Sequence, residues 1–445
     1  MRLSRHAAAV LIAATTACAG QTAAPVLTPE ALARLEVASR AASPSAAVLR
    51  ALGVAYYDRG RDTEARAVLT RAQQLAPTDG VIALHLGLAA ERQGDLAAAR
   101  EAYTTYIRVG RTKRVRRQLE QRLAALARQE MVVAARRAVA REAQLAAQPG
   151  SPSTVAVLPF AFHGTDSTLR PIARGLTELL AVDLSRVSAL TVVERLQVQA
   201  LLDELALAGA GRTDSATAVR TGRLVRAGRV VQGAVTQLGG SALRADAAVV
   251  DATTAEQLGA ARGSEPLDAV FALEKRLALD VLDALGVQLT AAERRELAQR
   301  PTRQLAAFLS YSSGLLAEDA GRLDEAERLY REAVRLDPGF SMARSRGASA
   351  AAARQGARVT AATVRASLAG STEGQVVAAA RRGAAAVPAS TTLSQAVNGV
   401  NPSPAAAVGG ADAAPTRDAA SSTAGSDAVG AGTGRIHVII RPPER

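Results

Sequence analysis

The chain has 445 residues, a formal net charge of +13 and 48% hydrophobic residues, but only 2% aromatic residues and no tryptophan. This length favours two or three domains, and the composition favours helices that pack closely through small side chains. The positive charge comes almost entirely from arginine, since lysine occurs only at positions 113 and 275. Such a charge favours anionic surfaces but specifies no fold. The single cysteine excludes an internal disulfide and a metal site built from several cysteines.

The N-terminus, residues 1–19, has the composition of an export signal. Two arginines precede an apolar run that starts at Ala7 and ends in small residues around Cys18. The run is shorter than the roughly 20 apolar residues that span a bilayer, so we predict a signal peptide. Two cleavages are open: lipoprotein processing, which would acylate Cys18, and ordinary cleavage at the small residues around it. We expect an exported, periplasmic protein, attached to the outer membrane if Cys18 is acylated.

Helical repeats are predicted over residues 29–111. The small residues of this region have the spacing of a tetratricopeptide unit, a helical hairpin in which small side chains let two helices touch. A second copy follows at a distance of 34 residues, as from Gly53 to Gly87. The positions that carry the pattern are Gly53, Ala65, Pro77, Gly87 and Ala99.

A long linking helix is predicted over residues 112–148. Two repeats leave an apolar end uncovered, and this helix has an apolar stripe that can cover it. The residues of the stripe are Val115, Leu119, Leu123, Leu126 and Val133.

Residues 154–286 predict an α/β layer domain, so the whole chain is expected to be an α+β, multi-domain protein. The order is strand, helix, strand, helices, hairpin, edge strand and a last helix that stops at Gly286. The hairpin is predicted at Gly239 and Gly240, because two glycines between β-type runs favour a tight turn.

A third repeat-like hairpin is predicted within residues 290–350. Thr290 and Glu293 form a capping box that starts a helix. Ala326 and Pro338 keep the tetratricopeptide spacing.

The rest of the chain is rich in Ala, Gly, Ser and Pro and has few large apolar residues. We predict that residues 351–433 are disordered, because they cannot offset the entropy of ordering. Residues 434–445 alternate apolar and polar side chains and predict a lone strand that could add to a sheet edge.

The stretch from Leu190 to Val235 resembles the central part of the CsgG/HfaB family of curli-assembly and related envelope lipoproteins. The shared features are the strand that ends at Glu194–Arg195, a leucine-rich helix and the Gly-Ala-Val strand that begins at Gly233. No converging catalytic partners are evident, so we interpret Arg195 as a cap or ion pair at a strand-to-helix joint. A subunit interface is the alternative. The resemblance covers residues 154–286 and implies an envelope protein.

The chain departs from that family where the family forms a secretion channel. Each family subunit inserts two membrane-spanning hairpins, whereas the corresponding links here are only QLGGSALR and TTAEQLGAARGSEP. A membrane-spanning strand needs roughly 9–11 residues, and a hairpin needs two such strands. We therefore do not carry the channel function over from the resemblance.

No catalytic motif is evident. Neither lysine lies in a phosphate-binding loop, and Gly209 and Gly211 follow a helix where a dinucleotide fingerprint needs a strand. His85, His163 and His437 are scattered singly, so no metal cluster is predicted. We expect no enzymatic activity and no cofactor.

Two surfaces remain as candidates for binding. The first is the groove of the repeats, where Tyr57 and Arg61 are the candidate contacts for a partner because Tyr57 lies outside the consensus packing positions. The second is a run of seven positive residues from Arg108 to Arg122. It lacks the stacking aromatics typical of nucleic-acid modules, which leaves a solvated helix face or a contact with anionic lipid or polysaccharide.

The sequence therefore predicts an envelope protein that binds other proteins or peptides as a scaffold or accessory factor of secretion or surface assembly. A subunit of an oligomeric secretion channel and a polysaccharide- or lipid-binding protein are the alternatives. We expect no nucleic acid partner, and a homo-oligomer remains open.

Overall fold

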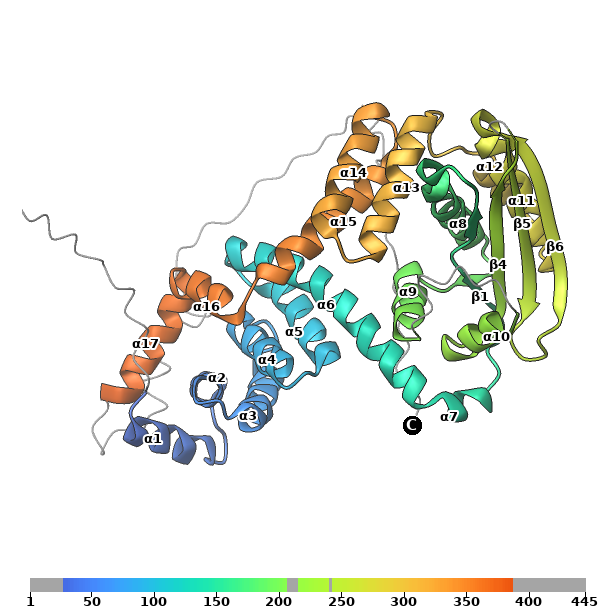
Figure 1. The fold of residues 1–445 in the computed structure, drawn as a ribbon. Coiled ribbons are helices and arrows are strands. Elements are labelled where there is room, and N and C mark those ends of the chain that lie inside the picture. Colours follow the sequence, from blue (N-terminus) through green and yellow to red (C-terminus); the bar gives the residue numbers. More distant parts are fainter. Residues whose placement is uncertain (1–26, 206–214, 240–241, 387–445) are drawn as a thin grey trace, which may run out of the picture. The chain divides into compact units, whose positions relative to one another are not determined.

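The computed structural model describes residues 27–205, 215–239 and 242–386 (Figure 1). These residues all belong to the first of two compact units, Met1–Asn401. The predicted signal peptide, Cys18, Gly240 and the strand at 434–445 lie outside the described residues. No helix among the described residues is both long enough and apolar enough to cross a membrane.

The N-terminal region contains the two predicted hairpins, preceded by one short helix. Its helices are α1 (Pro29–Ser39), α2 (Ala46–Asp58), α3 (Asp62–Leu75), α4 (Gly80–Arg92) and α5 (Leu96–Val109). A Cβ atom on Gly53 would lie 2.4 Å from Leu69 Cγ, and one on Gly87 would lie 2.4 Å from the ring of Tyr103. Glycine is therefore required where the two helices of each hairpin touch.

The linking helix is present in two pieces, α6 (Lys113–Ala140) and α7 (Glu142–Ala146). Val115, Leu119 and Leu126 are buried in the same core as the two hairpins, and Leu123 and Val133 pack against that core. Ala135, nearer the end of α6, belongs instead to a core on the sheet. One helix thus spans from the repeats to the α/β region.

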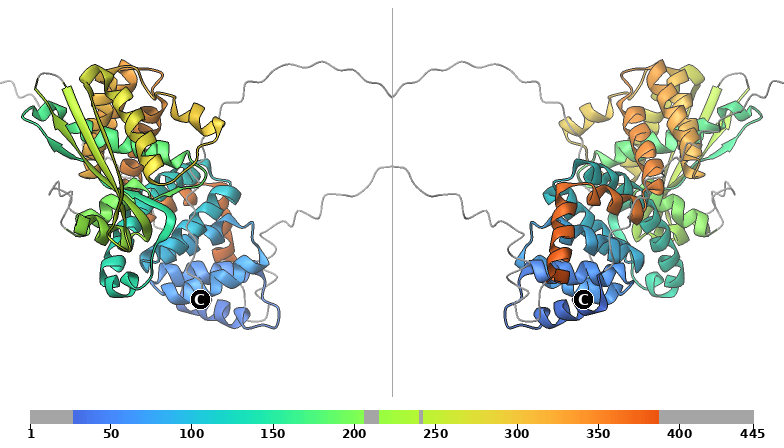
Figure 2. Two further views of the ribbon diagram at one scale, coloured as in Figure 1. Left: turned by 90° about the vertical axis from the view of Figure 1, so that its right-hand side faces the viewer. Right: turned by 90° about the vertical axis from the view of Figure 1, so that its left-hand side faces the viewer.

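The sheet has the strand order β3-β1-β4-β5-β6, and the short β2 also pairs with β4. The pairs among β1, β2, β3 and β4 are parallel, whereas β4–β5 and β5–β6 are antiparallel. The yellow β6 lies at the edge of the sheet, as predicted (Figures 1 and 2). The strands are β1 (Ser151–Val157), β2 (Ala161–His163), β3 (Thr191–Val192), β4 (Ala227–Gln237), β5 (Ala242–Asp251) and β6 (Gln257–Pro266).

Helices cover both faces of the sheet at β1 and β4. Val155 and Val157 point into one core with α8 (Arg170–Ser185) and α11 (Val270–Ala284). Ala156 and Leu158 point into the opposite core with α9 (Arg195–Glu204) and α10 (Ser215–Leu224). This alternation follows from the two-residue period of a strand.

The C-terminal helices begin at the predicted capping box, in which Thr290 and Glu293 exchange hydrogen bonds. The predicted third hairpin is α13–α14, where a Cβ atom on Gly314 would lie 2.6 Å from the ring of Tyr330. Its core is continuous with that of α8, α11 and the sheet, so the predicted division between residues 286 and 290 is no packing boundary. The helices are α12 (Ala291–Leu297), α13 (Leu305–Asp319), α14 (Leu323–Leu336), α15 (Ser341–Arg358), α16 (Ala361–Ala369) and α17 (Thr372–Ala386).

The prediction of disorder from residue 351 is wrong for residues 351–386, which form the end of α15 and all of α16 and α17. Alanine has the highest helix propensity, so a segment with few large side chains still forms helices when a few of them find an apolar partner. Here Val364 and Leu368 are buried against the N-terminal repeats. Residues 387–433 lie outside the described residues.

Candidate functional site

Arg195 lies at the centre of a buried group of charged side chains, which we call the charged cluster. It is the first residue of α9, and its side chain is 7% exposed. Its Nε atom lies 3.3 Å from Glu178 Oε2 on α8, and its terminal nitrogens donate to Glu318 and Asp319 at the end of α13. The joint predicted at Glu194–Arg195 therefore connects the α/β region to the third hairpin.

Three further arginines complete the charged cluster. Arg174 Nε donates to Asp319 Oδ2 at 2.6 Å, and Arg128 Nη1 of α6 donates to Glu318 Oε1 at 3.0 Å. Arg346 of α15 donates to Glu178. The cluster contains Arg128, Arg174, Arg195, Arg346, Glu178, Glu318 and Asp319.

The charges in this cluster hold each other in their ionised forms. Burial acts to raise the pKa of Glu178, but the guanidinium groups of Arg346, Arg195 and Arg174 outweigh it, so the pKa lies below its ordinary value. Burial likewise opposes ionisation of Glu318, and nearby arginines again lower its pKa. Glu178 and Glu318 therefore stay charged at neutral pH, which suits a permanent ionic connection better than proton transfer.

The same kind of contact recurs at one place in all three hairpins. In each hairpin we call the two positions that lie four and five residues after the packing glycine an arginine socket. The three sockets are residues 57–58, 91–92 and 318–319. In each socket an acidic residue binds an arginine from outside its own hairpin. Asp58 pairs with Arg365, Glu91 pairs with Arg122, and Glu318 and Asp319 pair with Arg195.

The structure corrects the predicted groove contacts. Tyr57 is only 2% exposed, because Arg92 lies over its ring at 4.0 Å and Arg365 lies 5.4 Å from the ring centre. It is therefore part of the first socket and is not open to an added partner. Arg61 is 40% exposed, but it lies over the ring of Tyr56 at 4.1 Å and pairs with Glu64.

The other predicted positions have structural roles. Ala65, Ala99 and Ala326 are fully buried between their helices, whereas Pro77 and Pro338 lie exposed in the turns that follow the hairpins.

The predicted strand and turn positions differ in the space around them. A Cβ atom on Gly233 would lie 2.4 Å from the carbonyl oxygen of Asp246, so β4 and β5 approach closely there. No described residue lies within 4 Å of a Cβ atom added to Gly239. Glu194 caps α9 with its backbone alone and is exposed.

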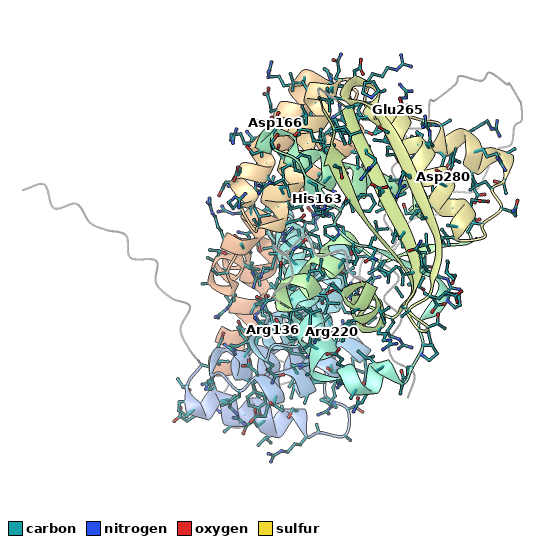
Figure 3. The ribbon with its side chains drawn as sticks, turned by 45° about the vertical axis from the view of Figure 1, so that its right-hand side comes forward. Arg136, His163, Asp166, Arg220, Glu265 and Asp280 are labelled. Atoms are coloured by element: carbon teal, nitrogen blue, oxygen red, sulfur yellow. The ribbon has the colours of Figure 1, made fainter. Side chains whose placement is uncertain are left out.

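Ion pairs also connect the linking helices to α9 and α10, and Figure 3 labels the two arginines that form them. Arg136 of α6 pairs with Glu204 of α9 at 3.3 Å, and Arg220 of α10 pairs with Glu142 of α7 at 2.8 Å. His163, also labelled, ends β2. In the part of the chain that the structure describes, no three His, Cys, Asp or Glu side chains are grouped so that they could hold a metal.

The basic run lies beside a hollow of about 830 Å³ between α6 and α15. Among the described residues, the hollow is lined by no acidic side chain; its walls are Lys113, Arg114, Arg117, Gln118, Gln121 and Gln355. Arg122, at the end of the run, is instead used in the second socket.

Glu178, Glu318, Asp319 and Arg365 were not among the residues predicted from the sequence. The sequence did contain a signal for the sockets, because each socket follows the packing glycine of its hairpin at the same distance. The identity of each arginine partner depends on the tertiary fold and could not be read from that spacing.

Two family models match the chain. The model for the curli production assembly/transport component CsgG matches residues 92–263, and a tetratricopeptide repeat model matches residues 309–340. The predicted combination of a CsgG-like domain with tetratricopeptide repeats is thereby confirmed. It supports an envelope- or secretion-related role that involves protein–protein interaction.

Two known proteins are similar over part of the chain. The putative adenylate cyclase 3 of Rhizobium meliloti (strain 1021) is 31% identical over 198 residues, which are 44% of this chain and 32% of that protein. The chain thus spans about a third of the length of that relative. The C-terminal domain of LpoB from Salmonella enterica is 18% identical, with a TM-score of 0.23 over 27% of this chain and 86% of that domain.

Proposed function

We propose that this chain, a CsgG-like domain joined to tetratricopeptide repeats, is a non-enzymatic scaffold or accessory factor in outer-membrane secretion or surface assembly. It acts in the periplasm and is attached to the outer membrane through Cys18. The family matches support the envelope role, and the repeats support binding of other envelope proteins.

The observation that carries this proposal is the charged cluster. It joins α6, α8, α9, α13 and α15 through buried, multiply paired charges, so the third repeat is held firmly on the CsgG-like domain. A scaffold needs such a connection, because a partner bound to the repeats is then held at a fixed position relative to that domain.

Fractionation of the native envelope tests the location. Wild-type protein should sediment with the outer membrane, and Cys18→Ala should release it to the soluble periplasmic fraction while leaving its amount and melting temperature unchanged. Recovery of the wild-type protein in the cytoplasm would refute the proposal. The native mass in mild detergent tests the alternative, since a large closed ring would favour a channel subunit and a monomer or dimer would favour a scaffold.

The absence of enzymatic activity is part of the proposal and is tested against the name of the relative. Purified full-length chain incubated with ATP and Mg²⁺ should form no more cyclic AMP than a heat-denatured sample. Formation of cyclic AMP in proportion to protein concentration would overturn the non-enzymatic assignment.

A second candidate function, binding of anionic lipid or polysaccharide, is favoured by the basic hollow. Its cations Lys113, Arg114 and Arg117 have no acidic neighbour in the lining. The chain should bind vesicles that contain phosphatidylglycerol but not pure phosphatidylcholine vesicles, and binding should weaken steeply with salt, as screening shortens the reach of charge. The double variant Arg114→Gln, Arg117→Gln should lose the preference for vesicles that contain phosphatidylglycerol. The control double variant Arg331→Gln, Arg335→Gln, at exposed positions, should keep that preference.

A further inference from the structure

The first two repeats are covered by the chain's own last described helices. Helix α16 packs against α6, and α17 packs against α1 and α2. Figures 1 and 2 show these orange helices beside the blue N-terminal helices. Val364 and Leu368, four residues apart on α16, are 2% and 5% exposed and belong to the core of the repeats.

Two polar anchors hold this segment. Arg365 binds Asp58 and lies near the ring of Tyr57, so it fills the first arginine socket. Glu373, the second residue of α17, accepts hydrogen bonds from Tyr106 Oη at 2.9 Å, Thr112 Oγ1 at 2.5 Å, and the backbone N–H groups of Arg111 at 2.9 Å and Thr112 at 3.0 Å.

The arginine of this segment is more exposed than the arginines in the other two sockets. The side chains of Arg122 and Arg195 are 20% and 7% exposed, whereas that of Arg365 is 40% exposed and lies on a helix of 9 residues. An isolated helix of that length is marginal in water, so α16 depends on its docking contacts for its structure. Segments with few buried apolar contacts open locally at low free energy.

We propose that the surface covered by α16 and α17 is the partner-binding surface of the first two repeats, and that these helices are a built-in ligand that a partner displaces. This inference rests on the proposed function. The partner is a helical segment of the same chemistry: two apolar residues four apart, an arginine directly after the first, and a carboxylate eight residues beyond that arginine. The arginine enters the socket at Asp58, and the carboxylate accepts from Tyr106 and Thr112.

The test uses full-length protein and a fluorescent peptide with the sequence of residues 359–379. In the intact chain the surface is occupied, so the peptide must compete with a segment tethered at high effective concentration. A variant with Arg365→Glu and Glu373→Gln has both anchors weakened. We expect the peptide to bind this variant at least about tenfold more tightly than the wild type, since apparent affinity scales with the fraction of open protein.

The matched control chain carries Arg358→Glu and Glu101→Gln, both at exposed positions outside these contacts, and should bind the peptide like the wild type. A peptide with the two anchor substitutions should bind neither chain. Equal affinity of the wild type and the opened variant, or no binding to either, would overturn the proposal. A dimer of the opened variant without peptide would identify a second copy as the occupant, which also overturns it.

Hydrogen exchange of the wild type gives a second measurement that does not depend on the variant. The amides of α16 and α17 should exchange at least about tenfold faster than those of α2 and α4, and excess peptide should accelerate them further. Exchange of α16 only with global unfolding would contradict a displaceable ligand. These outcomes are independent of membrane fractionation, so this inference and the proposed function can fail separately.

Discussion

Arg195 shows how much one buried side chain can depend on its partners. Its guanidinium group faces three carboxylates, those of Glu178, Glu318 and Asp319, and burial alone would make its charge unfavourable. Its pKa is nevertheless raised, because the attraction of Asp319, Glu318 and Glu178 exceeds the effect of burial. Arginine suits this position, since its planar group can bind several carboxylates at once.

Replacement of Arg195 should therefore destabilise the folded protein. We predict that Arg195→Met lowers the free energy of unfolding by about 3–5 kcal/mol, because three buried carboxylates, those of Glu178, Glu318 and Asp319, each lose one of their charged partners. Denaturant unfolding checks this value. The control is Arg335→Met, which breaks only the exposed pair with Glu332 and should cost about 0–1 kcal/mol. Equal effects of the two substitutions would contradict a stabilising role for the charged cluster.

Glu274 gives a prediction about pH. It is 0% exposed, and burial together with the neighbouring Asp183 raises its pKa from 4.5 to about 8, while Lys275 opposes the shift. Between these pH values the folded protein keeps a proton that the unfolded chain has lost. The contribution of this group to stability is thus present below pH 4.5 and is lost as the pH rises through about 8.

Glu274→Gln should remove this dependence, because an amide does not titrate. Relative to the variant, the wild type should lose up to about 1.4 kcal/mol of stability per pH unit in that window. Asp183, Lys275 and Arg186 lie around this site and remain unchanged in the variant. Denaturant unfolding at a series of pH values checks the result, and parallel curves for the two proteins would contradict it.

At the scale of elements, the hairpins depend on a glycine where two helices touch. We predict that Gly53→Leu destabilises the protein by about 1–3 kcal/mol, because its side chain would overlap Leu69 of the facing helix. Thermal unfolding measures the effect. Gly239→Leu is the control, since no described residue lies within 4 Å of the added Cβ atom. An unchanged melting temperature for Gly53→Leu would refute this packing.

The elements differ in how far the sequence determines them. The glycine and alanine spacing predicts all three hairpins, and the β-type runs on either side of Gly239 and Gly240 predict β4 and β5, because these signals are local in the sequence. The helices α16 and α17 were not predicted from the sequence. Their order depends on docking to residues more than 250 positions away, as in the 267-residue separation between Tyr106 and Glu373. Tyr57 was predicted to line an open groove, but Arg92 of the next hairpin and Arg365 of α16 both cover its ring.

At the scale of the whole molecule, the sequence boundary near residue 286 is misleading. The core of the CsgG-like region continues through α13, α14 and α15, and the charged cluster crosses the same boundary. The family model also begins at residue 92, inside the repeats. The CsgG-like region and its neighbours therefore belong to one compact unit with a continuous core.

We predict that a fragment ending at residue 289 does not fold stably. It exposes the face of α8 that contacts α13, and it leaves Arg195 without Glu318 and Asp319 and Glu178 without Arg346. Limited proteolysis and circular dichroism check this prediction. A fragment ending at residue 386, which retains all described elements, is the control and should resist proteolysis. Cooperative unfolding of the shorter fragment would show that the two regions are independent.

The distance between Tyr106 and Glu373 along the chain also matters during synthesis. At a translation rate of about 5–20 residues per second, the 267 residues that separate them take roughly 13–53 seconds to make. The nascent first hairpins therefore spend that interval without α16 and α17 to cover them. During this time they are open to any chaperone or helper that binds helices, and the finished protein closes that surface only as its last described helices emerge.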